Sequence, residues 1–212
     1  MSATWRETTN LVALDLEGSG AQDGDHEAIL EIAAVRLIAG RPDVATACTT
    51  LIDPGRPIPA RPWISPGLAG TALSGAPTLD AVEPQLARRL GGTYLVGHNI
   101  GVDWRLLHRR CPSISIAGLI DTHRLAKTLP ATGKNSLTDL LARHRLTDTV
   151  TAAAPASRPH RALWDTVGAA LLLDTLIQQR WAGDPSLDEL LAVAGPPAPK
   201  AAPETQATLF DC

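Results

Sequence analysis

The first fifty residues show the alternation of apolar and polar positions that is typical of strands. The segment LVALDLEG, residues 11–18, alternates in this way and stops at a Gly-Ser-Gly turn. Apolar runs over 29–40 and 43–53 predict two more strands with a short turn between them. Three strands joined by such short connections predict the antiparallel half of a sheet.

The rest of the chain shows apolar residues at helical spacing, interrupted by short strands. Helices are expected over 78–90, 102–110, 136–144, 161–180 and 187–192, and strands over 93–99 and 115–122. The longest helix follows Arg158-Pro159, a dipeptide that helix interiors exclude. Strands that then alternate with helices predict an α/β fold, with a mixed sheet of about five strands flanked by helices.

Composition divides the chain into a folded domain and a tail. With 44% hydrophobic and 19% charged residues, residues 1–193 can form one core. Residues 54–77 are rich in Gly and Pro and predict a long surface connection. Residues 194–212 are rich in Pro and Ala and predict a disordered tail ending in QATLF. Because no apolar run reaches about 18 residues, we expect a cytoplasmic protein without membrane contact.

Charge and cysteine content exclude several classes of site. The net charge of −3 gives no global positive field, so a polyanion must be bound by local groups. Cys48, Cys111 and Cys212 form no C-x-x-C pair, which argues against a disulfide scaffold and a thiolate zinc site. Five Trp, one Tyr and one Phe are too few for a platform that stacks several bases.

Two carboxylates lie two residues apart in the first predicted strand. Because side chains alternate along a strand, Asp15 and Glu17 share one face. Such a pair is costly to bury without a cation, and oxygen ligands suit Mg²⁺ or Mn²⁺. Alone, such a pair is more often a strand end whose carboxylates reach water.

Two later segments add acidic residues and a histidine. Asp103 follows a predicted strand and begins a helix, a position typical of catalytic groups and of helix caps. His160 and Asp165 would diverge by about 140° on a helix, so they converge only if His160 precedes it. Together with the strand pair they match two-metal phosphodiester hydrolysis, in which carboxylates hold two cations about 3.5–4 Å apart. A histidine then serves as the base that takes the proton of water.

These motifs, in this order, resemble the DEDDh family of 3′-to-5′ exonucleases, the ribonuclease H-like group that includes the proofreading epsilon subunit of bacterial replicative DNA polymerases. LDLEGSG from Leu14, VGHNIGVDWRLL from Val96 and HRALWD from His160 resemble its three motifs. The connecting segments LEIAAV, LIDPGRPIP, LIDT and GKNSLTDLLARH are similar too, so the likeness spans about residues 10–180.

The resemblance implies a ribonuclease H-like fold and a metal-dependent 3′-5′ exonuclease that releases nucleoside monophosphates from DNA in proofreading or repair. It implies two Mg²⁺ or Mn²⁺ ions, the general base His160, and the metal ligands Asp15, Glu17, Asp103 and Asp165. It also implies that the terminal nucleotide contacts Gly18, Ser19, His98 and Asn99. The expected substrates are single-stranded or frayed 3′ ends of nucleic acid.

Three departures from the family pattern affect those nucleotide contacts. Gly18 and Ser19 replace the usual threonine pair, Val102 replaces a phenylalanine, and Pro66-Gly67 replaces a His-Gly. Trp63 is a candidate to stack on a terminal base, although a tryptophan that covers the core edge is the alternative.

Charged groups beside these motifs have simpler expected roles. Asp25, His26 and Glu27 lie in a polar turn and are expected to be solvated. Arg158 and Arg161 flank His160 and are candidate phosphate contacts.

The QATLF tail resembles the short Q-x-x-L-F peptides by which bacterial replication proteins dock on the sliding clamp. Gln206, Leu209 and Phe210 would be its anchors, with a frayed terminus as the alternative. Two other functions stay open at this point. One is RNA trimming by an oligoribonuclease-like or ribonuclease T-like enzyme, and the other is a non-catalytic accessory protein of a clamp or polymerase.

Overall fold

The structure is a computed structural model that describes residues 3–130 and 133–196. The tail residues Gln206, Leu209 and Phe210 lie outside these ranges, so their docking stays a prediction.

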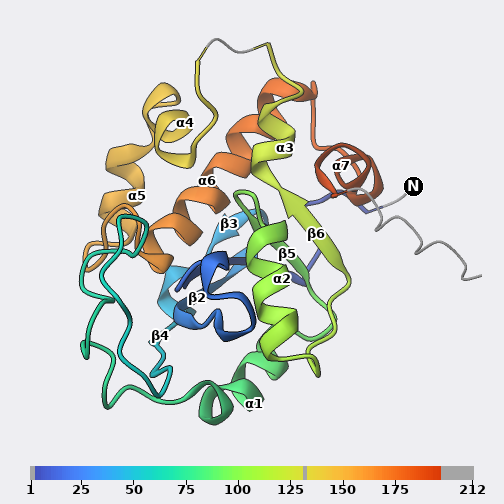
Figure 1. Ribbon diagram of the computed structural model, residues 1–212. Helices are drawn as coiled ribbons and strands as arrows, with labels where there is room; N and C mark the ends of the chain where they lie inside the picture. Colours follow the sequence, from blue (N-terminus) through green and yellow to red (C-terminus); the bar gives the residue numbers. More distant parts are fainter. Residues whose placement is uncertain (1–2, 131–132, 197–212) are drawn as a thin grey trace, which may run out of the picture.

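A mixed six-stranded sheet forms the centre of the molecule (Figure 1). Its strands are β1 (Leu11–Gly18), β2 (Ile29–Ile38), β3 (Arg41–Pro42), β4 (Cys48–Leu51), β5 (Tyr94–Gly97) and β6 (Gly118–Asp121). The order is β3-β2-β1-β5-β6, with β4 also pairing with β2. β1 runs antiparallel to β2 but parallel to β5, which confirms the predicted mixed sheet.

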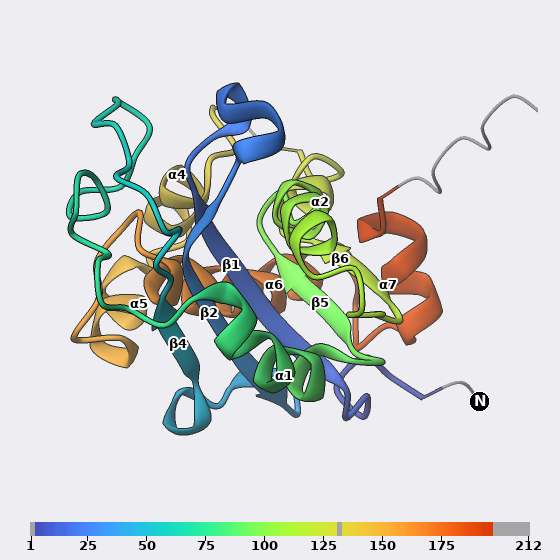
Figure 2. The ribbon, with the colours of Figure 1, turned by 60° about the horizontal axis from the view of Figure 1, so that its bottom comes forward.

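Helices cover both faces of the sheet (Figure 2). They are α1 (Leu79–Leu90), α2 (Gly101–Arg110), α3 (Thr122–Ala126), α4 (Leu137–Arg143), α5 (Thr147–Ala153), α6 (Ala162–Arg180) and α7 (Leu187–Ala194). Alternate residues of β1 belong to different cores: Leu11 and Ala13 pack with α6, whereas Val12 and Leu14 pack with α1 and α2. Within the described ranges, no helix is long and apolar enough to cross a membrane.

The long connection between β4 and α1 has a small core of its own. It contains no helix and no regular strand, as its Gly and Pro content predicted. Ile58, Ile64, Leu68 and Leu73 nevertheless pack against Leu30 of β2. This packing holds the connection beside the end of β1.

The strand expected over 43–53 is wrong in its first half. Residues Val44–Thr46 form the short 3-10 helix η2, and the strand β4 begins only at Cys48. Pro42 has no N–H to continue a ladder, so β3 ends there after two residues. The helical segments η1 (Ala21–His26), α3 and α5 were not predicted, because segments this short show no clear period.

Candidate active site

Three carboxylates meet where the end of β1 faces the first turn of α6. Asp15 and Glu17 continue the face of β1 on which Leu11 and Ala13 pack against α6. Asp165 lies in the first turn of that helix. One oxygen from each carboxylate lies within 4.8 Å of the other two, close enough for all three to bind one cation.

A fourth carboxylate approaches the cluster from α2. Asp103 lies in the first turn of α2, and its Oδ1 accepts the Leu16 N–H at 2.9 Å. Its charge is close enough to Asp15 to raise the pKa of that carboxyl. Asp103 therefore ties α2 to β1 and adds negative charge beside the three-carboxylate set.

Burial gives these carboxyl groups a high affinity for protons. Loss of water raises the pKa of Glu17 and Asp103 to about 7. It raises the pKa of Asp165 to about 6 and that of Asp15 well above its ordinary range. Among the residues that the structure describes, no Lys or Arg forms an ion pair with Asp15, Glu17 or Asp165. An uncompensated set of oxygen donors fits Mg²⁺ or Mn²⁺.

These raised pKa values predict a pH-dependent destabilisation of the metal-free protein. Because the pKa of Glu17 is about 7 when folded and near its ordinary 4.5 when unfolded, the native state binds more protons between these values. The contribution of Glu17 to stability therefore falls as pH rises through this window. In EDTA, we expect Glu17→Gln to match the wild-type melting temperature near pH 4.5 and to exceed it at pH 8.

With Mg²⁺ at pH 8, the wild type should have the higher melting temperature of the two proteins, since only the wild type keeps the full ligand set. Thermal melts of both proteins at the two pH values, with EDTA or Mg²⁺, test the prediction. A melting-temperature difference that does not change with pH would contradict it.

Ser65 holds Glu17 from the long connection. Its buried Oγ donates to Glu17 Oε2 at 2.5 Å, which lowers the pKa of Glu17 against the effect of burial. Sequence analysis missed Ser65 because it lies 48 residues away, in a segment without periodicity. The hydroxyl fixes the orientation of one carboxylate of the cluster.

His160 lies in the loop before α6, the position from which the sequence predicted that it could converge with Asp165. Its backbone is in the left-handed region, with φ 64°, and its N–H donates to Asp165 Oδ1 at 3.4 Å. The side chain is exposed, and its charge lowers the pKa of Asp165. The imidazole is therefore at the solvent side of the carboxylate cluster.

Glu31 and Arg161 form an ion pair beside the cluster. Glu31 lies opposite Glu17 in the β1–β2 register. Arg161 donates from Nε and Nη2 to the two Glu31 oxygens at 2.7 and 2.9 Å. Both oxygens of a buried carboxylate already bind the Arg161 guanidinium, and its contact with phosphate stays a prediction. Sequence analysis missed Glu31 because its LEIAAV segment offered no partner charge nearby.

Gly18 and Ser19, which follow Glu17, pack against neighbouring backbone and α2 instead of facing solvent. The N–H and Oγ of Ser19 bond to the backbone of Ala28 at 2.9 Å each, and the side chain is buried. A Cβ on Gly18 would come within 3.0 Å of Leu106, so the chain passes α2 closely there. Trp63 donates from Nε1 to the Ser19 carbonyl at 3.3 Å and remains 48% exposed. The Arg61 guanidinium lies over this ring, 5.5 Å from its centroid, so the ring is only partly exposed beside the site.

His98 and Asn99 lie at the other side, after β5. Both ring nitrogens of His98 are bonded, to Thr122 Oγ1 and the Asn135 carbonyl, at 2.9 Å each. Asn99 is exposed in the left-handed region, and its N–H donates to Asp121 Oδ1 at 2.8 Å. His98 therefore connects the end of β5 to Thr122 and Asn135, whereas the Asn99 side chain faces solvent.

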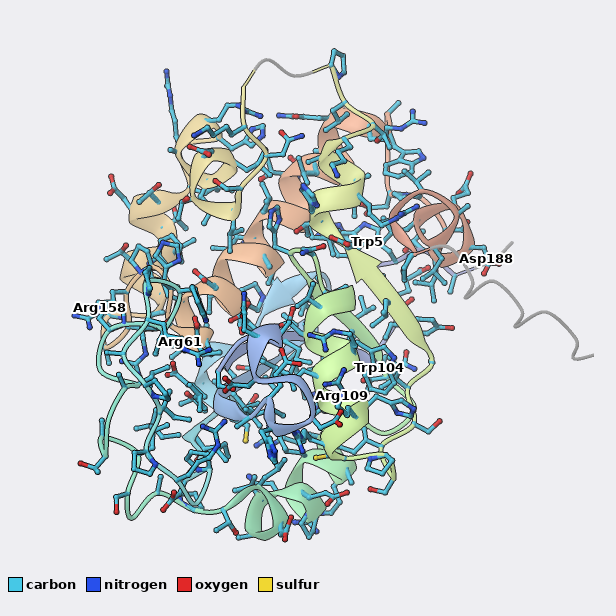
Figure 3. The ribbon with its side chains drawn as sticks, in the orientation of Figure 1. Trp5, Arg61, Trp104, Arg109, Arg158 and Asp188 are labelled. Atoms are coloured by element: carbon cyan, nitrogen blue, oxygen red, sulfur yellow. The ribbon has the colours of Figure 1, made fainter. Side chains whose placement is uncertain are left out.

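The turn after β1 is less solvated than its sequence predicted. Glu27 is buried and accepts from Arg105 at 2.8 Å and from Arg109 at 3.4 Å, which overturns the expectation of a solvated residue. Asp25 and His26 are exposed, as expected. Arg109 of α2 donates to the Gly24 carbonyl at 3.1 Å, and Arg61 of the long connection donates to Asp23, one residue earlier, at 3.1 Å, so both arginines hold η1 (Figure 3).

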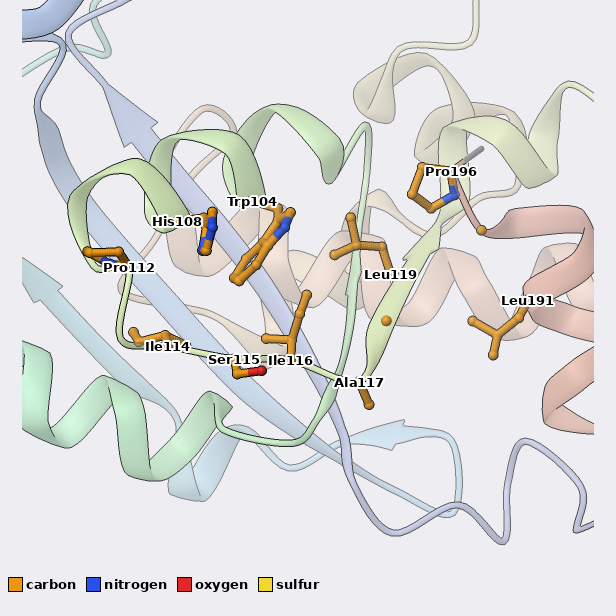
Figure 4. A pocket seen from close by; sticks show the side chains of 12 residues that line it. Trp104, His108, Pro112, Ile114, Ser115, Ile116, Ala117, Leu119, Leu191 and Pro196 are labelled. Atoms are coloured by element: carbon orange, nitrogen blue, oxygen red, sulfur yellow. The ribbon is translucent and has the colours of Figure 1, made fainter. Parts of the chain in front are cut away.

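A separate groove of about 700 Å³ lies between α2, β6 and α7 (Figure 4). Trp104 and His108 stack on one wall, with ring centroids 5.0 Å apart, and Leu191 of α7 lies on the other. The carboxylates do not line this groove, so it is distinct from the acidic cluster.

Comparison with known families and proteins links this geometry to nucleases. A family profile described as exonuclease, RNase_T, matches residues 12–173. A DNA polymerase III subunit epsilon-like protein of Rhodobacter capsulatus is 30% identical over 80% of this chain and 24% of its own. The DNA polymerase III subunit epsilon of Aquifex aeolicus is 26% identical over 80% and 81%. The chain thus spans about a quarter of the length of the Rhodobacter relative.

Solved structures with the same architecture are nucleases as well. Exonuclease X in complex with 5′-overhanging duplex DNA matches with a TM-score of 0.64 and 26% identity, over 85% of this chain and 98% of that one. The cell-death related nuclease CRN-4 matches with a TM-score of 0.58 and 16% identity, over 79% and 63%, a likeness of fold alone.

Proposed function

Because the chain belongs to the RNase_T exonuclease family, we propose that it hydrolyses DNA from the 3′ end with divalent cations bound at its carboxylate cluster. The observation that carries the proposal is the convergence of Asp15, Glu17 and Asp165 within 4.8 Å. Three half-buried carboxylates so close together, with no Lys or Arg ion-pair partner, are costly unless they bind metal. Family membership and site chemistry therefore support the same reaction class.

Asp15, Glu17 and Asp165 would hold the first cation, and Asp103 lies where it can contribute to a second. When bound, divalent cations supply charge stabilisation for the phosphate and lower the pKa of water. Ser65 keeps Glu17 oriented, and the exposed imidazole of His160 takes the proton of the attacking water.

The terminal nucleotide would lie between two exposed apolar side chains. Trp63 is 48% exposed against the loop after Glu17, and Val102 is 52% exposed in the first turn of α2, next to Asp103. Stacking on such surfaces tolerates any base but needs it to be unpaired. We therefore propose that single-stranded or frayed 3′ ends are the substrates, bound also through Gly18 and Asn99.

Replacing Trp63 with alanine should weaken binding more than chemistry. We expect KM for a single-stranded oligonucleotide to rise about 5- to 150-fold, since a base stacked on an aromatic ring contributes about 1–3 kcal/mol. Steady-state kinetics with Trp63→Phe as the conservative variant test this. Ile38→Ala, which removes an equally exposed apolar residue elsewhere, serves as the control. A KM equal to the wild-type value in Trp63→Ala would remove Trp63 from the nucleotide site.

The names of the relatives also suggest a setting in DNA replication. The Aquifex relative is a DNA polymerase III subunit, and exonuclease X is complexed with DNA. We propose DNA proofreading or repair, in association with a polymerase or clamp, as the setting of this chain.

Matched oligonucleotides test the direction and the substrate of the reaction. We expect 5′-labelled DNA to give a ladder that shortens from the 3′ end with Mg²⁺ and disappears with EDTA. An inverted 3′-terminal nucleotide should block it. A faster ladder on RNA of the same sequence would establish the RNA-trimming alternative, and intact products in every reaction would support the accessory-protein alternative.

A further inference from the structure

The loop that carries His160 has few structural restraints of its own. His160 is exposed and adopts a left-handed backbone conformation, which is uncommon for residues other than glycine. Its N–H reaches Asp165 Oδ1 at 3.4 Å, a long hydrogen bond. A base that must approach water within hydrogen-bond distance needs a firmer support.

The next residue supplies that support. Arg161 is the N-cap of α6, in extended conformation, and its own side chain caps nothing. Its guanidinium instead binds Glu31 of β2 in a two-point contact at 2.7 and 2.9 Å. A planar fork on a carboxylate fixes direction as well as distance, which a single contact does not.

Glu31 also substitutes for the missing cap of α6. Its Oε2 accepts the Ala162 N–H, the first of the helix, at 3.4 Å. One turn further, Thr166 Oγ1 donates to the Ala33 carbonyl of β2 at 3.3 Å. The start of α6 is thus attached to β2 on both sides of Asp165.

We propose that Arg161, bound to Glu31, positions His160 for proton transfer. The contact joins the residue after His160 to the strand opposite Glu17, so it sets the distance between the imidazole and the carboxylate cluster. Arg161 itself touches neither the cation nor the substrate in this role. The inference rests on the proposed function, because it needs a reaction in which His160 acts.

Arg161→Gln should lower kcat about 10- to 100-fold with KM changed less than about twofold, because a misplacement of about 1 Å costs on this order. Glu31→Gln, which weakens the same contact from the other side, should give a similar loss. Arg161→Lys keeps the charge but not the fork and should give an intermediate value.

A double-mutant cycle with His160 separates positioning from a general structural role. If Arg161 acts through His160, Arg161→Gln should cost less than about twofold in a His160→Ala background. The affinity for Mn²⁺, measured by its paramagnetic signal, should stay within about twofold of the wild type. The proposal would be overturned if Arg161→Gln lowered kcat by the same factor with and without His160→Ala. It would also be overturned if Arg161→Gln lowered the affinity for Mn²⁺ by the same factor as kcat.

Two controls keep the outcome interpretable. The double variant Glu31→Gln/Arg161→Gln leaves no unpaired charge at the site and should fold even if Arg161→Gln alone does not. It should show the same loss of kcat. An inactive wild-type protein with Mg²⁺ would instead refute the proposed function, so the two failures are distinguishable.

Discussion

Replacing Asp15 with asparagine should lower the rate of hydrolysis at least about 10³-fold. The cation supplies several kcal/mol of transition-state stabilisation, and each 1.4 kcal/mol or so is tenfold in rate. Asp15 is the member of the cluster whose pKa is raised well above its ordinary range, because it is buried and other carboxylates surround it. Asparagine keeps the shape of the side chain but removes the charge that binds the cation.

The same substitution should raise the stability of the metal-free protein near pH 8. Asparagine relieves the repulsion among Asp15, Asp103, Asp165 and Glu17 that raises the pKa of Asp15. Activity assays and thermal melts in EDTA measure the two effects. Asp188→Asn, on the exposed first turn of α7, is the matched control: it should leave activity unchanged and should not raise the melting temperature, since a negative charge there favours the helix (Figure 3). An Asp15→Asn protein that retains a tenth of the wild-type activity would contradict the assignment.

Replacing His160 with alanine should lower kcat about 10²- to 10⁴-fold, the usual contribution of general acid–base catalysis. The cation affinity should change little, because His160 lies at the solvent side of the carboxylates and outside the three-carboxylate set. Because the His160 side chain is exposed, a small molecule can occupy the space that it leaves in His160→Ala. Added imidazole should therefore restore part of the activity.

Kinetics of His160→Ala at increasing imidazole concentration make this measurement. His108→Ala removes an exposed histidine that lines the remote groove and should behave as the wild type. If His160→Ala keeps the wild-type kcat, another group must accept the proton.

The sequence predicted the parts of the fold that have a clear period. The alternation of Leu11 to Leu14 places these side chains in two cores, and the same alternation puts Asp15 and Glu17 on the α6 face. The long helix begins at Ala162, one residue after its predicted start. Short elements such as η1 and α5 escaped prediction because segments of this length show no clear period.

The carboxylates and His160 could be found from motifs, but their supports could not. Ser65 lies 48 residues from Glu17, and Arg161 lies 130 residues from Glu31. These pairs meet only through the packing of the long connection and of α6 on the sheet. An arginine beside His160 suggests a phosphate contact from the sequence, whereas its contact with Glu31 is visible only in the fold. The residues that form the cluster were therefore predictable, and the contacts that position them were not.

Isotope incorporation during hydrolysis tests the central claim most directly. Single-stranded DNA is digested by the wild-type protein in H₂¹⁸O with Mg²⁺, and the products are analysed by mass spectrometry. The account predicts nucleoside 5′-monophosphates that carry one ¹⁸O on phosphorus, and none from Asp15→Asn or with EDTA. Products that end in 3′-phosphates, or labelled monophosphates formed equally well by Asp15→Asn, would contradict it.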